Sequence, residues 1–146
     1  MTHPQFEKHR PLLDAALQAI QTRGYWAAFS EMPSPKVYGE TAPQDGKSAF
    51  EAHLGKSFEL DQPGQSGWHG GEKSPYGAEL GVQYPVCDAE VLIAAGEKAM
   101  AGWQQVGAEG RTGICIEMLQ RLNQQSFEIA HAVMMTTGQG WMMAFQ

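Results

Sequence analysis

The sequence predicts an α-rich chain in which helical segments at the two ends flank a long irregular stretch with at most short strands. Apolar residues recur at helical intervals over residues 2–23 and 88–146. Between them, residues 24–86 hold 16 of the chain's 25 glycines and prolines, which favour turns and short extended pieces. A stretch this long with so little periodicity is unusual inside a compact domain. We therefore expect it to wrap over a surface that another part supplies.

The length and composition are those of a mildly acidic globular domain. The chain has 146 residues, of which 42% are hydrophobic and 18% charged, and its formal net charge is −6. The apolar fraction excludes a disordered chain, and the lack of a Lys/Arg cluster argues against a nucleic-acid partner or an anionic membrane surface. The sequence has no signal-peptide core and no apolar run long enough for a membrane span. The two cysteines, Cys87 and Cys115, lack metal-type spacing, which is typical of a cytoplasmic protein.

The first segment, residues 2–23, has the pattern of an amphipathic helix. Thr2 and Gln5 have the spacing of a capping box, and Gly24 is a suitable terminator. Pro11 removes a backbone donor from the helix interior, so we expect a kink there or a helix that starts at this proline. The predicted apolar face consists of Leu12, Leu13, Ala16, Leu17 and Ile20.

Three pieces of the irregular stretch have a local preference. The residues at 36–40 and 81–85 favour short extended segments. One helical island is expected near residues 46–54, with Asp45 as its N-cap and Gly55 as its stop.

Residues 88–146 carry the strongest helical pattern. Asp88 is expected to cap a first helix, which a glycine-containing link at 107–110 separates from a long helix over 111–137 that ends at Gly138. The first apolar stripe is Val91, Leu92, Ala95, Ala99 and Trp103. The second is Cys115, Met118, Leu119, Leu122, Ser126, Ile129, Ala130 and Val133. Lying mostly off that second stripe are Glu117, Gln120, Gln124 and Glu128.

A new apolar segment begins after Gly138 with Trp141, Met142, Met143 and Phe145, and it has no cap or polar tail. Either it is a terminal helical turn that docks on the chain's own core, or the chain is cut inside a larger fold. Because natural domains seldom present such a segment to water, the second interpretation is favoured.

Two glycine-containing motifs resemble nucleotide-binding loops without meeting their requirements. Residues 46–48, Gly-Lys-Ser, lack the correctly spaced glycine and the buried strand that precede a phosphate-binding loop. Residues 138–140, Gly-Gln-Gly, follow a predicted helix rather than a strand, and Met143 stands where the third glycine belongs. Neither motif is therefore assigned a cofactor.

The histidines His3, His9, His53, His69 and His131 form no metal-ligating or catalytic pattern. No two lie four residues apart on one helix, and no cysteine or carboxylate cluster completes a metal site. His131 lies at the edge of an apolar stripe, where a structural histidine is expected.

The cysteines are also expected to be structural. Cys115 lies on an apolar helix face, where a thiol packs as a small hydrophobic group. Cys87 precedes Asp88, whose carboxylate opposes formation of a thiolate. The methionine pairs at 134–135 and 142–143 are expected to fill a core or an interface. The residues by themselves therefore assign no catalytic, cofactor-binding or metal-ligating position.

A longer series of residues in the second half resembles a known family. It comprises residues 88–90, 99–103, Arg111, Leu119, Leu122, 127–130 and 135–139. Their order is similar to the early helices of the aldehyde dehydrogenase superfamily. There, a helix with an Ala-Phe-x-x-Trp-like signature precedes an Arg-initiated helix that ends near Glu-Thr-Gly-Lys. This chain departs from those signatures at Met100, Thr136 and Gln139.

The first half extends the resemblance to one subfamily. Residues 24–26 and 32–40, with the glycine-rich stretch, stand where most members carry a compact hairpin. This arrangement is similar to the aldehyde dehydrogenase-like proteins of phenylacetic acid degradation, the PaaN type, over nearly the whole chain. The resemblance to the superfamily in general covers only residues 85–140.

The resemblance implies an α-rich fragment of an α/β fold, in which residues 1–146 supply N-terminal helices of a Rossmann-like NAD-binding domain. It implies a full-length parent that oxidises an aldehyde or semialdehyde with NAD or NADP. The family's catalytic cysteine and glutamate lie beyond this chain, so Cys87 and Cys115 inherit no role and the chain alone is expected to be inactive. The expected partner is the rest of the aldehyde dehydrogenase fold or a second copy. Residues expected to pack there are Trp103, Leu119, Leu122, Ile129 and Val133.

Two other functions stay open on the residues alone. One is a free-standing helical module that binds a partner through its Met/Trp-rich C-terminal segment. The other is a small ligand-binding domain around Trp68, His69 and Tyr76, which only the aromatic content supports.

Overall fold

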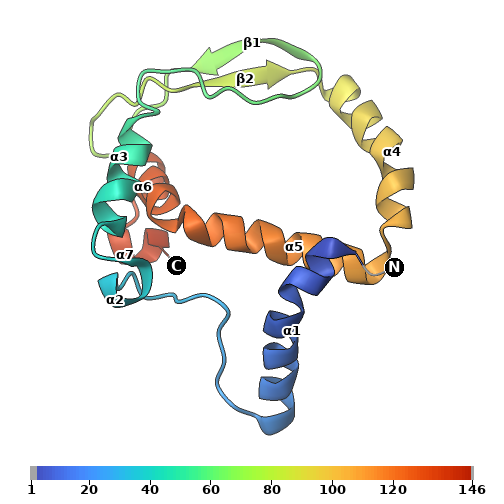
Figure 1. Ribbon diagram of the computed structural model, residues 1–146. Coiled ribbons are helices and arrows are strands. Elements are labelled where there is room, and N and C mark those ends of the chain that lie inside the picture. Colours follow the sequence, from blue (N-terminus) through green and yellow to red (C-terminus); the bar gives the residue numbers. More distant parts are fainter. Residues whose placement is uncertain (1–2, 146) are drawn as a thin grey trace. The chain divides into compact units, whose positions relative to one another are not determined.

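Figure 1 shows the computed structural model, which describes residues 3–145. These residues form two compact units. The helical unit comprises residues 3–30 and 99–124, and the mixed unit comprises residues 31–98 and 125–145. None of the helices within 3–145 is both long and apolar enough to cross a membrane.

The helical unit is built on the packing of α1 (Pro4–Thr22) against α5 (Gly107–Gln124). The two backbones approach so closely at Gly113 that a Cβ there would overlap backbone atoms of Phe6. Ile116 is buried at the same crossing. The helices therefore meet through small residues, which permit a short distance between helix axes.

The ends of α1 differ from the expected ones. The Nδ1 atom of His3 accepts a hydrogen bond from the Gln5 amide at 3.2 Å, so His3 is the N-cap, while Thr2 of the predicted capping box lies outside the described residues. The helix runs through Pro11 instead of starting there. Its left-handed terminating residue is Arg23, with φ 54°, and not the predicted Gly24.

The mixed unit begins with a helical turn, α2 (Pro35–Tyr38), where an extended piece was predicted over 36–40. Ser34 explains the difference, because its Oγ accepts a hydrogen bond from the Lys36 amide at 3.3 Å and Pro35 occupies the first helical position.

The predicted helical island is α3 (Ala42–Glu51), which begins earlier than expected. Its N-cap is Thr41, and Asp45 lies within the first turn, where a carboxylate interacts favourably with the helix dipole. The helix ends at Glu51 with Ala52 as its C-cap, earlier than the predicted stop at Gly55, which has φ 69° in the turn that follows.

The core of the mixed unit lies where α3 packs against α6 (Ser126–Thr137). A Cβ at Gly46 would overlap Phe127, so this glycine permits the helix contact. The buried cluster beside it consists of Phe50, Leu80 and Val82, with Leu54, Ala132 and Met135 packed against it. The irregular stretch thus has a small core of its own.

Two short antiparallel strands, β1 (Gln65–Gly70) and β2 (Gln83–Cys87), form a hairpin in which His69 faces Tyr84. The extended piece predicted at 81–85 is confirmed over its last three residues. The expectation of at most short strands also holds for the described part of the chain.

The helix α4 (Ala89–Gln105) begins as predicted, because the Val91 amide donates to the Asp88 carboxylate at 3.0 Å. Its predicted apolar stripe contains no buried residue. The exposed large residues on this helix are Val91, Leu92, Ile93, Met100 and Trp103.

The long helix predicted over 111–137 is two helices, α5 and α6, separated at Gln125. Gly110 lies inside α5 and not in a link. The predicted stripe residues Cys115, Met118, Leu119 and Leu122 are exposed. The side of α5 that packs on α1 instead carries Gly110, Gly113, Ile116 and Glu117. Gly138 ends α6 with φ 78°, as predicted.

The final segment forms α7 (Trp141–Phe145), which packs on α6. The ring of Phe127 lies 4.9 Å from that of Phe145 and 6.0 Å from that of Trp141. The structure thus shows this apolar segment as a helical turn that packs on α6.

Candidate functional site

Within residues 3–145, no group of three or more His, Cys, Asp or Glu side chains is arranged to hold a metal ion. The five histidines are dispersed. His3 caps α1, His9 is buried beside Glu117, and His53 pairs with Glu128. The other two are His69, on β1, and His131, on α6.

His131 has the structural role expected of it. Its ring stacks on Phe50 at 6.3 Å and lies 4.5 Å from the ring of Trp141. Burial lowers the pKa of His131, and the nearby charge of Lys47 lowers that pKa further. The neutral imidazole is therefore favoured within this aromatic cluster.

The strongest charge cluster lies in the helical unit, around Glu117. Its Oε2 atom is 2.6 Å from Lys8 Nζ and 2.8 Å from His9 Nε2, and its Oε1 atom is 3.0 Å from Arg121 Nε. Hydrogen bonds from Lys8, His9 and Arg121 lower the pKa of Glu117 to about 2. The cluster joins α1 to α5 and has a structural role.

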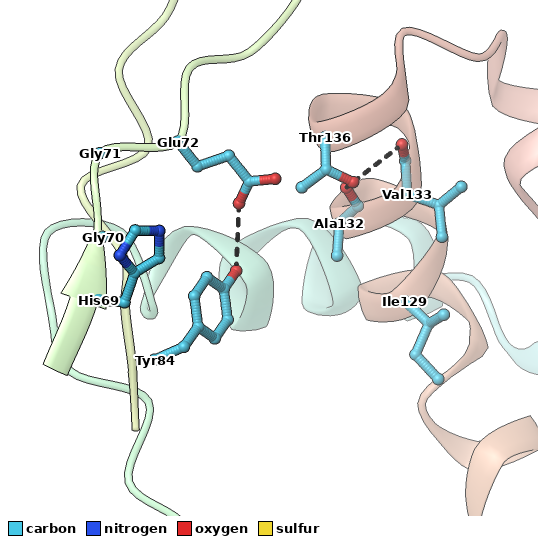
Figure 2. A pocket seen from close by; sticks show the side chains of 9 residues that line it. All are labelled: His69, Gly70, Gly71, Glu72, Tyr84, Ile129, Ala132, Val133 and Thr136. Atoms are coloured by element: carbon cyan, nitrogen blue, oxygen red, sulfur yellow. Dashed lines mark hydrogen bonds between the residues drawn. The ribbon is translucent and has the colours of Figure 1, made fainter. Parts of the chain in front are cut away.

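The mixed unit contains two adjoining pockets between the hairpin region and α6. The outer pocket, about 690 Å³ in volume, is lined by His69, Gly70, Gly71, Glu72, Tyr84, Ile129, Ala132, Val133 and Thr136 (Figure 2). The inner pocket, about 300 Å³, is lined by Phe50, His53, Phe58, Leu80, Val82, Tyr84, Gln125, Glu128, Ile129, Ala132 and Thr136. The residues common to both are Tyr84, Ile129, Ala132 and Thr136.

Tyr84 and Glu72 supply the polar pair of the outer pocket. The Tyr84 hydroxyl donates to the Glu72 carboxylate at 3.3 Å, and Figure 2 shows both side chains opposite Thr136. Burial raises the pKa of Tyr84, and the Glu72 charge raises that pKa further. The phenol therefore keeps its proton and acts as a donor at neutral pH.

The inner pocket has an aromatic wall and one hydrogen bond between a histidine and a glutamate. The ring of Phe58 lies 5.4 Å from that of His53 and 6.3 Å from that of Tyr84. His53 Nε2 is 2.8 Å from Glu128 Oε1. Neither pocket brings a cysteine or serine near a histidine, so the linings hold no nucleophile and base pair.

The residues in the two rejected nucleotide-loop motifs have local structural contacts. Lys47 Nζ lies 3.6 Å from Glu51 on the same helix, and Ser48 Oγ accepts a hydrogen bond from the Gln44 side chain. At the second motif, the Tyr76 hydroxyl donates to the carbonyls of Gly138 and Gln139, at 3.1 and 3.2 Å.

The cysteines take no part in either pocket. The Cys87 thiol donates to Gln62 Oε1 at 3.3 Å, and Cys115 is exposed rather than packed. Of the three residues proposed for a ligand site, His69 lines the outer pocket, whereas Trp68 and Tyr76 line neither of these two pockets.

Sequence reasoning missed Glu72 and Tyr84 as a pair. They are 12 residues apart and meet only because the hairpin reverses the chain. Ile129 and Thr136 lie seven residues apart on one helix, and that spacing is the signal that places both on one face.

No protein-family model matches the chain, and no curated protein matches it. Among solved structures, the chain is similar to the crystal structure of an NAD-dependent aldehyde dehydrogenase from Burkholderia multivorans. The two are 53% identical, and the TM-score is 0.91. The match covers 100% of this chain and 26% of that one, so the chain spans about a quarter of that relative's length. This match confirms the predicted fold class, an α-rich fragment of an aldehyde dehydrogenase fold.

Proposed function

We propose that this chain is the N-terminal part of an NAD(P)-dependent aldehyde dehydrogenase-like protein of phenylacetate or related aromatic catabolism, acting in the cytoplasm. The observation that supports this most is 53% identity to an NAD-dependent aldehyde dehydrogenase across all of the chain. In the full-length parent, an aldehyde or semialdehyde would be oxidised to the acid. The contribution of residues 1–146 is packing and not chemistry.

The exposed apolar side chains of α4 and α5 support a packing role. Trp103 on α4 is 44% exposed, and Leu119 and Leu122 on α5 are each 52% exposed. Such residues on amphipathic helices mark surfaces that another element covers. The covering element is the remainder of an aldehyde dehydrogenase fold or a second copy in a homo-oligomer. The predicted packing residues Ile129 and Val133 instead line the pockets.

The pockets do not fit a nicotinamide dinucleotide. A pyrophosphate is held by backbone amides at a helix N-terminus or by cationic side chains. The ionised groups lining the two pockets include the carboxylates Glu72 and Glu128, and their linings contain no Lys or Arg. The cofactor, NAD or NADP, would therefore be held by parts of the parent outside this chain, as would the nucleophile and the general base.

A chimera tests the proposal. Residues 1–146 replace the matching quarter of the Burkholderia multivorans enzyme, and NADH formation at 340 nm is followed with an aldehyde that this enzyme oxidises. We expect the chimera to be active and the isolated 146-residue chain to be inactive. A folded chimera without activity, or NADH formation by the isolated chain, contradicts the proposal.

Two variants of the chimera test whether the exposed face of α5 packs against the rest of the enzyme. The chimera carrying Leu119→Lys and Leu122→Lys should lose activity or solubility, whereas Lys98→Gln on α4 should not change it. Equal activity of both variants contradicts the packing role.

The alternative, a free-standing interaction module, is favoured by one observation. Met142 and Met143 on α7 are 44% and 68% exposed beside the docked Trp141. A module of this kind would sediment as a monomer, unfold in one cooperative step and bind no hydrophobic dye. Dye binding and self-association of the isolated chain argue against it.

A further inference from the structure

We propose that the two adjoining pockets of the mixed unit bind one small organic cation with an apolar body, such as an arylalkylammonium ion. This binding would be independent of aldehyde oxidation, because no residue of the pockets is assigned to that reaction.

The space and its walls suit a small amphipathic molecule. The inner pocket is in the size range of small-ligand sites, and three residues of its lining, Phe50, Leu80 and Val82, form the buried core of this unit. Four residues are shared with the outer pocket, so one molecule can extend from the apolar wall toward Glu72.

The charges of the lining favour a cation over an anion. The titratable groups that line the pockets are His53, His69, Glu72, Tyr84 and Glu128. Glu128 is already paired with His53 at 2.8 Å. Among residues 3–145, no cationic side chain forms an ion pair with Glu72, and its hydrogen bond is from the neutral Tyr84 hydroxyl, so its carboxylate has capacity for further donors.

Tyr84 also belongs to both pockets. Its side chain lines both pockets, and its ring lies 6.3 Å from that of Phe58. A cation near Glu72 would thus lie beside the Tyr84 hydroxyl, whose oxygen can accept a hydrogen bond from an ammonium group while its proton is donated to Glu72. A ligand carboxylate at the same place would meet Glu72 and be repelled.

A series of three ligands with one skeleton tests the charge preference on the unaltered chain. 2-Phenylethylammonium chloride, 2-phenylethanol and sodium phenylacetate are titrated into the 15N-labelled 146-residue chain. We expect millimolar binding of the ammonium ion, about tenfold weaker binding of the alcohol and still weaker binding of the acid. The amide shifts should be confined to the segments that line the two pockets, residues 50–58, 69–72, 80–84 and 125–136. Equal affinities, preference for the acid, or shifts centred elsewhere overturn the proposal.

A charge-removing variant then tests the named carboxylate. Glu72→Gln should weaken binding of the ammonium ion about tenfold and leave that of 2-phenylethanol unchanged. The control is Glu79→Gln, because Glu79 belongs to the same loop, is 75% exposed and pairs with Lys73 away from the lining. An equal effect of both variants, or none at Glu72→Gln, also overturns the proposal.

Discussion

Glu117 is a side chain whose role depends on three partners from two helices. Lys8 and His9 lie on α1 and Arg121 lies on α5, so the carboxylate joins the two helices of the helical unit. The sequence pattern placed Glu117 off the apolar stripe of its helix. The structure places it toward α1, because the contact there is made through small residues and ion pairs.

The lowered pKa of Glu117 predicts an acid-dependent loss of stability. The ordinary pKa is 4.5 and the folded value is about 2, so the stabilisation is fully present above pH 4.5 and is lost as the pH falls toward 2. We expect Glu117→Gln to lower the unfolding temperature at pH 7 and to flatten the pH dependence between those values. Thermal unfolding followed by circular dichroism measures both.

The control for that variant is Glu7→Gln. Glu7 lies 3.7 Å from Arg10 on the surface of α1 and does not reach α5. A drop in unfolding temperature as large as that of Glu117→Gln would contradict the assigned role.

The lowered pKa of His131 predicts a second pH effect, in which the titrating group is a base instead of a carboxylic acid. Burial holds its pKa below the ordinary 6.5, so the unfolded chain binds the proton more readily. The free energy of unfolding should therefore decrease as the pH falls from above 6.5 toward the lowered value, and His131→Phe should remove that part of the slope. NMR titration of the imidazole measures the pKa directly.

A second variant identifies one cause of this shift. Lys47→Gln removes the nearby positive charge and should raise the pKa of His131. An unchanged or lower pKa in that variant would contradict the electrostatic contribution.

At the scale of elements, the crossing of α1 and α5 depends on glycine. A Cβ at Gly113 would overlap backbone atoms that cannot move without shifting α1. Gly102 on α4 has no other atom within 4 Å of the same position. Both residues lie inside helices, so they differ in packing and not in backbone conformation.

These two glycines give a matched prediction. Gly113→Ala should destabilise the chain by about 1–3 kcal/mol through overpacking. Gly102→Ala should stabilise it by about 0.5–1 kcal/mol, because alanine is the better helix former. Urea unfolding measures both free energies. Similar values at the two positions would show that the α1–α5 contact does not form as described.

The apolar stripes of α4 and α5 correctly predicted that these segments are helical. They did not predict which residues of the helices are buried. Val91, Leu92 and Trp103 recur at helical intervals, yet none is buried against another described element. Periodicity identifies the face of a helix that avoids water. It does not identify the element that covers that face.

For the whole molecule, these exposed faces predict the behaviour of the isolated chain. We expect it to bind 8-anilinonaphthalene-1-sulfonate and to self-associate at micromolar concentrations, because large apolar patches are exposed. Leu119→Lys with Leu122→Lys should reduce dye fluorescence without lowering the unfolding temperature. Dye fluorescence and sedimentation velocity are the measurements, and a monodisperse chain that binds no dye contradicts the expectation.

Residue type and spacing were enough to predict the α-rich class, the helix caps at Asp88 and Gly138, and the resemblance to aldehyde dehydrogenases. These features depend on the local order of residue types, which the amino-acid sequence contains directly. The packed fold was needed to show that Glu117 and Gly113 of α5 face α1, and that the hairpin brings Tyr84 to Glu72. Such pairings join residues that are distant along the chain, and their stability depends on packing that local periodicity does not specify.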